Sequence, residues 1–265
     1  MAGHSKWANI KRQKARVDSA RGKIFTKVSR EIIVAARSGG GDPAANFQLR
    51  TAIEKAKAAG IPNDNIERSI AKGSGTFGGS DALEAIRYEG YGPGGVAVLI
   101  EALTDNRNRT AADLRSAFGK NGGNLGETGC VGWMFEKKGV AIVYAPFDGK
   151  GRSTELNETA LLEVALEAEA ESYELFEDEE ADVMGAEVFT STDNLEALSQ
   201  ALSAHGYRVT SEERWIPSNQ VSVTDPEQAR LLLRLMDTLE DLEDVQSVTA
   251  NFEMADDLLA LSMSG

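Results

Sequence analysis

The residues best suited to chemistry lie at the start of the chain. Between His4 and Arg30 the sequence holds nine Lys or Arg side chains and one acid, Asp18. Lys and Arg attract nucleic-acid phosphates because each contact releases condensed counterions. The candidate phosphate-binding residues are Lys6, Lys11, Arg12, Lys14, Arg16, Arg21, Lys23, Lys27 and Arg30. The alternative is that these cations form an ordinary solvated surface.

The charge of the whole chain favours the first interpretation. The 265 residues have a formal net charge of -14 and a pI of about 4.7. Residues 1–80 carry 15 basic and 6 acidic side chains, a net of +9, whereas residues 81–265 carry 13 basic and 36 acidic side chains, a net of -23. A polyanion would therefore be attracted to one end of the chain and repelled by most of the rest.

Trp7 follows Lys6 inside this basic segment. An indole flanked by cations can stack on an unpaired base. It can equally anchor the segment on a neighbouring helical domain, and the sequence does not separate the two roles.

A second candidate site precedes a predicted helix. It consists of Asn106, Arg107, Asn108 and Arg109. Helix N-termini favour anions, and amide and guanidinium groups add donors. The competing interpretation is that Arg107 and Arg109 pair with nearby acids while Asp105 caps the helix.

The sequence offers little for catalysis or metal binding. Two histidines and one cysteine nearly exclude a zinc site of the His/Cys type. The glycines match neither a phosphate-binding loop nor a nucleophile elbow. Cys130 is expected to be a buried, unreactive thiol, and the acidic runs to be solvated faces. We therefore expect no enzyme activity, no catalytic residue, no metal, no cofactor and no small-molecule substrate.

The basic segment leads into a predicted three-helix domain. Apolar residues recur at helical spacing from Ile24 to Ala36, and Gly39–Gly41 ends that helix. Asp42 before Pro43 predicts the N-cap of a second helix that reaches Gly60. A third helix is expected at 63–72. With the basic arm, this makes a first domain over residues 1–75.

The rest of the chain mixes helices and strands. Strands are expected at 86–91, 96–103 and 131–135, with a helix at 110–120. Next come a strand at 140–144, a helix at 158–170, strands at 172–176 and 186–190, a helix at 194–205 and a strand at 207–216. This β-α-β-β-α-β order is the ferredoxin-like arrangement.

A final helix at 226–242 and a strand at 245–251 have no partners in that unit. They are expected to return to the earlier strands. The predicted fold class is therefore α+β and multidomain: an N-terminal three-helix domain, a mixed α/β domain at 82–135 plus 218–252, and a ferredoxin-like domain inserted in it at 136–217.

Three long stretches resemble the YebC family. They are MAGHSKWANIKRQKARVDSARGKIFTK, GGGDPAANFQLRTAIEKAKAAGIPNDNIERSIAKG and YEGYGPGGVAVLIEALTDNRNRTAADLRSAF. The resemblance covers essentially the whole chain and is weaker over residues 150–215. It implies three domains, one of them an inserted ferredoxin-like domain. The basic arm and the Asn106–Arg109 stretch match family motifs, and the family has no agreed catalytic residue to transfer.

The resemblance also implies a function. Bacterial members of the family are commonly labelled probable transcriptional regulators that bind DNA, and a mitochondrial branch activates translation. Bacterial relatives are tied to ribosomes and to relief of stalled peptide synthesis. We therefore expect a cytoplasmic nucleic-acid-binding regulator of gene expression, with DNA or ribosomal RNA as its partner and no membrane association. The alternative is an acidic protein–protein adaptor without direct nucleic-acid contact.

Overall fold

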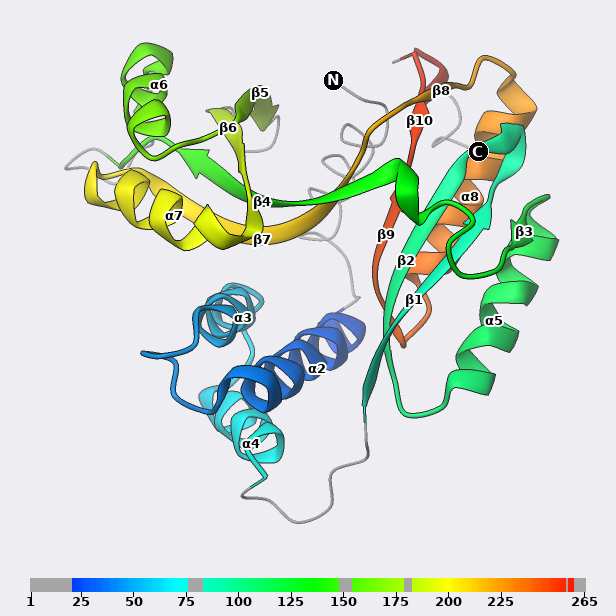
Figure 1. The fold of residues 1–265 in the computed structure, drawn as a ribbon, viewed down its shortest axis with the longest axis horizontal. Coiled ribbons are helices and arrows are strands. Elements are labelled where there is room, and N and C mark those ends of the chain that lie inside the picture. Colours follow the sequence, from blue (N-terminus) through cyan, green and yellow to red (C-terminus); the bar gives the residue numbers. More distant parts are fainter. Residues whose placement is uncertain (1–20, 76–82, 148–153, 179–182, 256, 260–265) are drawn as a thin grey trace. The chain divides into compact units, whose positions relative to one another are not determined.

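The computed structural model describes residues 21–75, 83–147, 154–178, 183–255 and 257–259, and their side chains from residue 24 onward (Figure 1). The chain is α+β, as predicted, and divides into two compact units. The first comprises the chain up to Phe135 together with the chain from Pro217 onward, and the second runs from Glu136 to Ile216.

The first unit contains a three-helix bundle. Its helices are α2 (Arg21–Gly39), α3 (Phe47–Ala58) and α4 (Asn63–Gly73). Their apolar faces meet in a core that includes Val28, Ile32, Leu49, Ala56 and Ile66. Helices α2 and α4 approach so closely that a Cβ on Gly73 would lie 2.4 Å from the carbonyl oxygen of Ile33. Glycine is therefore required at the end of α4.

The predicted N-cap of α3 is wrong. Asn46, not Asp42, accepts the capping hydrogen bond, from the Leu49 amide at 3.0 Å. The Asn46 side-chain amide also donates to the carbonyls of Ala35 and Gly40, both at 2.8 Å. An aspartate has no donor for these carbonyls. Asp42 instead accepts from the Ala44 amide in the preceding turn.

The first unit also contains an antiparallel sheet in the order β3-β1-β2-β9. The strands are β1 (Glu84–Tyr91), β2 (Ala97–Thr104), β3 (Asn124–Leu125) and β9 (Val245–Ala250). A short 3-10 helix, Pro93–Gly95, joins β1 to β2. Every residue of β2 except Glu101 is buried, which fits its place between two neighbours.

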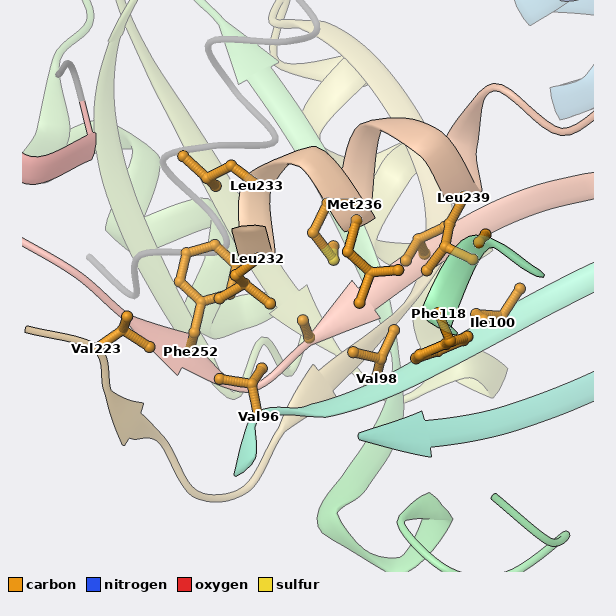
Figure 2. Packing of buried hydrophobic residues seen from close by; sticks show 14 of the residues in the cluster. Val96, Val98, Ile100, Phe118, Val223, Leu232, Leu233, Met236, Leu239 and Phe252 are labelled. Atoms are coloured by element: carbon orange, nitrogen blue, oxygen red, sulfur yellow. The ribbon is translucent and has the colours of Figure 1, made fainter. Parts of the chain in front are cut away.

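Two helices pack on one face of this sheet, α5 (Arg107–Lys120) and α8 (Pro226–Glu240). Figure 2 shows Val98 and Ile100 of β2 meeting Phe118 of α5 and Met236 of α8. Phe252 from the short strand β10 (Phe252–Glu253) joins the same core, and β10 pairs in parallel with β8 (Val221–Ser222). Helix α8 and strands β9 and β10 thus complete a core that already includes Val96, which lies 130 residues before the start of α8.

The second unit is the ferredoxin-like one. Its elements are β4 (Phe135–Tyr144), α6 (Glu158–Glu167), β5 (Ser172–Asp178), β6 (Val183–Thr190), a 3-10 helix (Thr192–Asn194), α7 (Leu195–Ala204) and β7 (Arg208–Pro217). The sheet order β5-β6-β4-β7 is that of the ferredoxin-like fold. Leu161 of α6 and Leu198 of α7 pack against Val143 and Val188 of the central strands.

The predicted strand at 131–135 is wrong. Residues Gly132–Met134 form a 3-10 turn, and the strand begins at Phe135 and continues to Tyr144. The cause is Glu89, whose carboxylate accepts hydrogen bonds from the amides of Val131 and Gly132. Those amides are therefore engaged by a side chain and do not join a strand ladder.

Within the described part of the chain, no helix combines the length and the apolar character that a membrane crossing requires.

Candidate nucleic-acid interface

Trp7 and five of the nine predicted phosphate-binding residues of the basic segment lie outside the described residues. These five are Lys6, Lys11, Arg12, Lys14 and Arg16. Arg21 and Lys23 belong to the first turns of α2, but their side chains are outside the description. Their contact with nucleic acid stays a prediction.

The other two predicted phosphate-binding cations of α2, Lys27 and Arg30, contact the mixed domain. Lys27 Nζ donates to the carbonyl oxygen of Glu240 at 2.6 Å. Arg30 Nη1 donates to the carbonyl oxygens of Leu103 and Glu243, at 3.1 and 2.9 Å. Glu240 is the last residue of α8, where the helix dipole favours a cation. Both side chains therefore join α2 to the end of α8 and the loop that follows it.

Arg30 also belongs to a cluster around Asp244, whose side chain is only 7% exposed. Asp244 Oδ1 accepts from Arg30 Nη1 at 2.8 Å, and Oδ2 accepts from Arg109 Nη2 at 2.8 Å. The hydroxyls of Thr110 and Thr104 donate to Oδ2 at 2.8 and 3.3 Å. We call these five residues the Asp244 cluster.

The cluster keeps Asp244 ionised. Burial by itself raises the pKa of a carboxyl group, but hydrogen bonds from Arg109, Thr110 and Arg30 outweigh it and lower the pKa of Asp244. The same contacts raise the pKa of Arg109. Two guanidinium groups predicted to bind phosphate are thus already paired with a carboxylate of the chain itself.

At the start of α5, the hydrogen bonds of the Asn106–Arg109 stretch show which of its side chains are already engaged within the chain. Asn106 caps the helix by accepting from the Arg109 amide at 3.1 Å, so the alternative in which Asp105 is the cap is wrong. Asp105 instead accepts from Arg109 Nη2 at 2.8 Å. Arg107 is 68% exposed and lies 3.7 Å from a Glu84 carboxylate oxygen. Arg107 and Asn108 point to solvent, whereas Arg109 is held by two acids.

A small cavity of about 210 Å³ adjoins this cluster. Its lining contains three acids, Asp113, Glu243 and Asp244, against one cation, Arg109. This balance disfavours an anionic ligand, so the cavity does not extend the predicted phosphate site.

Sequence reasoning missed a second buried carboxylate, Glu89 of β1, which is 1% exposed. Its Oε2 accepts from the amides of Val131 and Gly132 at 2.8 and 2.7 Å. Burial raises its pKa, but these amide donors and Arg87 produce a net lowering. The available signal was an acid within an otherwise strand-forming stretch, on the same side of β1 as Arg87 and Tyr91.

Glu89 holds the segment 126–134, which we call the Trp133 loop. The Trp133 side chain is 71% exposed and that of Tyr91 is 38% exposed. Both donate to the Cys130 carbonyl oxygen, Trp133 Nε1 at 3.3 Å and Tyr91 Oη at 3.1 Å. Two aromatic rings at the surface are therefore tied to one backbone atom.

Cys130 itself is partly exposed rather than buried as expected. Burial and the charge of Glu89 raise the pKa of its thiol, which stays protonated at neutral pH. Among the described residues, no group of three or more His, Cys, Asp or Glu side chains is placed to hold a metal ion.

The fold is that of an α+β protein with three parts. The helical bundle and the mixed domain make up the first compact unit, and the ferredoxin-like part is the second. Two family models match the chain: the TACO1/YebC protein N-terminal domain over residues 5–76, and the TACO1/YebC second and third domain over residues 83–252. The chain belongs to the TACO1/YebC family.

Relatives of known sequence and structure agree with this assignment. A probable transcriptional regulatory protein of Nostoc punctiforme is 68% identical over 266 residues, covering 100% of both chains. A protein of the same description from Microcystis aeruginosa is 64% identical and covers 99% of this chain and 100% of its own. The crystal structure of a conserved hypothetical protein from Aquifex aeolicus is 44% identical, with a TM-score of 0.80 over 91% of this chain and 94% of its own.

Proposed function

We propose that this protein regulates gene expression by binding nucleic acid through its basic N-terminal segment, and that it acts by binding rather than by catalysis. The observation that carries the proposal is the charge layout, with nine cations and one acid between residues 4 and 30 of a chain whose net charge is -14. The regulatory names of its relatives support the same role.

We assign phosphate contact to fewer residues than the sequence suggested, because several of the candidate cations already have partners within the chain. Arg30 and Arg109 already donate to Asp244, and Lys27 donates to the Glu240 carbonyl oxygen. We therefore assign phosphate contact to Lys6, Lys11, Arg12, Lys14, Arg16, Arg21 and Lys23. Arg107 and Asn108 are exposed and stay candidates for a lesser contact.

We favour a structured RNA, such as that of the ribosome, over a long DNA duplex. One basic end can approach an RNA while most of the acidic remainder stays outside. A long duplex would instead extend past the basic end and meet the net charge of -23 on residues 81–265.

The test compares binding to ribosomes and to duplex DNA at several salt concentrations. The variant carries Glu in place of Lys11, Arg12, Lys14 and Arg16. If these four side chains each neutralise a phosphate on a duplex, log K falls against log salt with a slope of about -3.6, and the variant flattens it. We expect tight ribosome binding that the variant loses, with only weak binding to DNA.

A matched control separates the basic segment from total charge. Arg115, Lys120, Arg230 and Arg234 are exposed cations of α5 and α8, and changing all four to Glu alters the net charge equally. This control should keep its affinity. Tight DNA binding that resists competitor would assign the protein to transcription instead. Equal binding by the wild type and both variants would overturn the proposal and favour an acidic adaptor.

A further inference from the structure

The Trp133 loop is a rigid part of the surface. Gly126 and Gly132 lie in close contact with other residues: an added Cβ would lie 2.5 Å from Cys130 Sγ and 3.0 Å from Glu89 Oε1 respectively, so a side chain at either position would displace one of them. Gly129 has a φ of +92°, which favours glycine. Buried Glu89 holds two consecutive amides of the loop. These contacts restrict the conformations that the loop can adopt.

The fold uses a buried charge to hold this conformation. Removing a carboxylate from water is unfavourable unless hydrogen bonds replace the lost hydration. Here the loop backbone supplies them to Oε2, whereas Oε1 has no hydrogen-bond donor among the described residues and faces Arg87 Nε at 3.6 Å. None of the three residues Gly132–Met134 is buried. The buried carboxylate therefore positions a surface segment that adds nothing to the core beyond Val131.

One hydrogen bond from each ring also favours a particular orientation of the ring. An exposed Trp side chain normally samples several rotamers, whereas the indole N–H of Trp133 is held by the Cys130 carbonyl. Tyr91 is held by the same oxygen. The polar edges of both rings are occupied, and the apolar surface of the indole faces solvent at 71% exposure. A pre-oriented, open aromatic face is what stacking on a flat ligand requires.

Arg87 adds a cation beside this surface. Every second side chain of a strand lies on the same face of the sheet. Arg87, Glu89 and Tyr91 therefore share one face of β1, with Glu89 between the other two. The Arg87 side chain is 42% exposed, and its Nε lies 3.6 Å from Glu89 Oε1. Arg87 is therefore engaged with Glu89, and we assign it no phosphate contact.

We propose that Trp133, supported by Tyr91, stacks on an unpaired nucleobase and forms a second nucleic-acid contact in the mixed domain. This inference rests on the proposed function. A base within a duplex is covered on both faces by its neighbours, so the ligand is a single-stranded or flipped-out nucleotide. The basic N-terminal segment then supplies affinity for phosphate, and Trp133 supplies selection for exposed bases.

The test uses two single-stranded RNA probes of equal charge, octa-adenylate and an octamer of the same length made of abasic nucleotides. Stacking of one base on an aromatic ring corresponds to about a 5- to 150-fold change in affinity on alanine substitution. W133A should therefore bind octa-adenylate about 5- to 150-fold more weakly and should bind the abasic octamer as the wild type does. W133F should retain part of the affinity for octa-adenylate.

A second readout reports the indole directly. In protein labelled with 5-fluorotryptophan, the ¹⁹F resonance of Trp133 is the one that W133F removes. It should shift on addition of octa-adenylate and stay in place with the abasic octamer. L166A is the matched control, because Leu166 is an apolar side chain that is 72% exposed on α6, and its loss should leave both probes unaffected.

The outcomes distinguish this inference from the proposed function. If octa-adenylate binding is lost in the basic-segment variant but unchanged in W133A, with no shift of the Trp133 resonance, the function stands and stacking is overturned. Equal losses for both probes in W133A would also overturn stacking. If W133A weakens ribosome binding but leaves octa-adenylate binding unchanged, the ring does not select unpaired bases and the inference fails. If the wild type binds neither RNA nor DNA, both proposals fail.

Discussion

Two carboxylates, Asp244 and Glu89, are buried in the first unit and are used in opposite ways. Asp244 is surrounded by side chains that come from distant parts of the chain: the guanidinium groups of Arg30 and Arg109 and two threonine hydroxyls. Glu89 is surrounded by backbone, and its hydrogen-bond donors are the amides of Val131 and Gly132.

The difference separates a structural site from a candidate binding site. Asp244 uses cations that would otherwise be available to a phosphate, and it joins α2 to α5 and the loop before β9. Glu89 uses only main-chain donors and leaves the side chains of its loop exposed. A count of charges would rank the surroundings of Asp244 above the Trp133 loop as a candidate nucleic-acid site. The hydrogen bonds favour the Trp133 loop instead, because the cations around Asp244 are already paired.

Removal of Asp244 should have the largest effect on stability. D244A leaves two guanidinium groups without their shared acceptor, and a charge left buried without its partner typically costs about 3–5 kcal/mol. We expect a loss toward the lower end of that range, because Arg30 keeps Glu243 and the half-exposed Arg109 keeps Asp105. The free energy of unfolding in urea measures the loss, and amide hydrogen exchange in α2 and β9 should become faster.

Glu243 provides the control for that prediction. It also pairs with Arg30, at 3.1 Å, but its side chain is 67% exposed. E243A should therefore lose about 1 kcal/mol or less. Equal losses in the two variants would mean that the Asp244 cluster does not join the helical bundle to the mixed domain.

The substitution E89Q should have an intermediate effect. A glutamine keeps one carbonyl acceptor but places an amide donor in the buried site, and we expect a loss of about 1–3 kcal/mol. The amides of Val131 and Gly132 should exchange faster, because they lose a charged acceptor. Exposed Glu84 is the control, since E84Q should change neither stability nor this exchange.

The contribution of Glu89 to the free energy of unfolding should decrease at acidic pH. The pKa of Glu89 is lower in the folded chain than its ordinary value. Its contribution to stability is therefore present above the ordinary pKa of glutamate and is lost as the pH falls through the folded pKa. The difference between wild type and E89Q should shrink over that acidic range. A difference that stays constant would mean that the charge of Glu89 is not what holds the loop.

The smallest effect is expected at Arg107. Its contact with Glu84 is long and exposed, so R107A should lose less than about 0.5 kcal/mol. R109A should lose about 1.5 kcal/mol, because Arg109 donates to Asp105 and Asp244 at 2.8 Å. Thermal unfolding of the two variants side by side tests this order, and a larger loss in R107A would reverse our assignment of the two arginines.

The sequence predicted the elements better than it predicted their ends and contacts. The β-α-β-β-α-β order was recovered because alternating and helical apolar patterns are local. The cap of α3 was misplaced because Asn46 is selected by carbonyls of the preceding helix, which no local pattern reports. The strand expected at 131–135 failed for a related reason, since Glu89 lies 42 residues before the amide that it holds.

By itself, the sequence determined the concentration of positive charge before residue 31, the acidic remainder and the succession of helices and strands, because composition and short-range periodicity carry them. Only the tertiary structure decided which of the cations are paired with acids of the chain and which are free of such pairing and so available to bind phosphate. Arg30 meets Asp244 across 214 residues, and a buried carboxylate must find donors wherever the fold brings them. For the same reason only the fold could show that Trp133, unremarkable in sequence, is held at the surface by a charge buried beneath it.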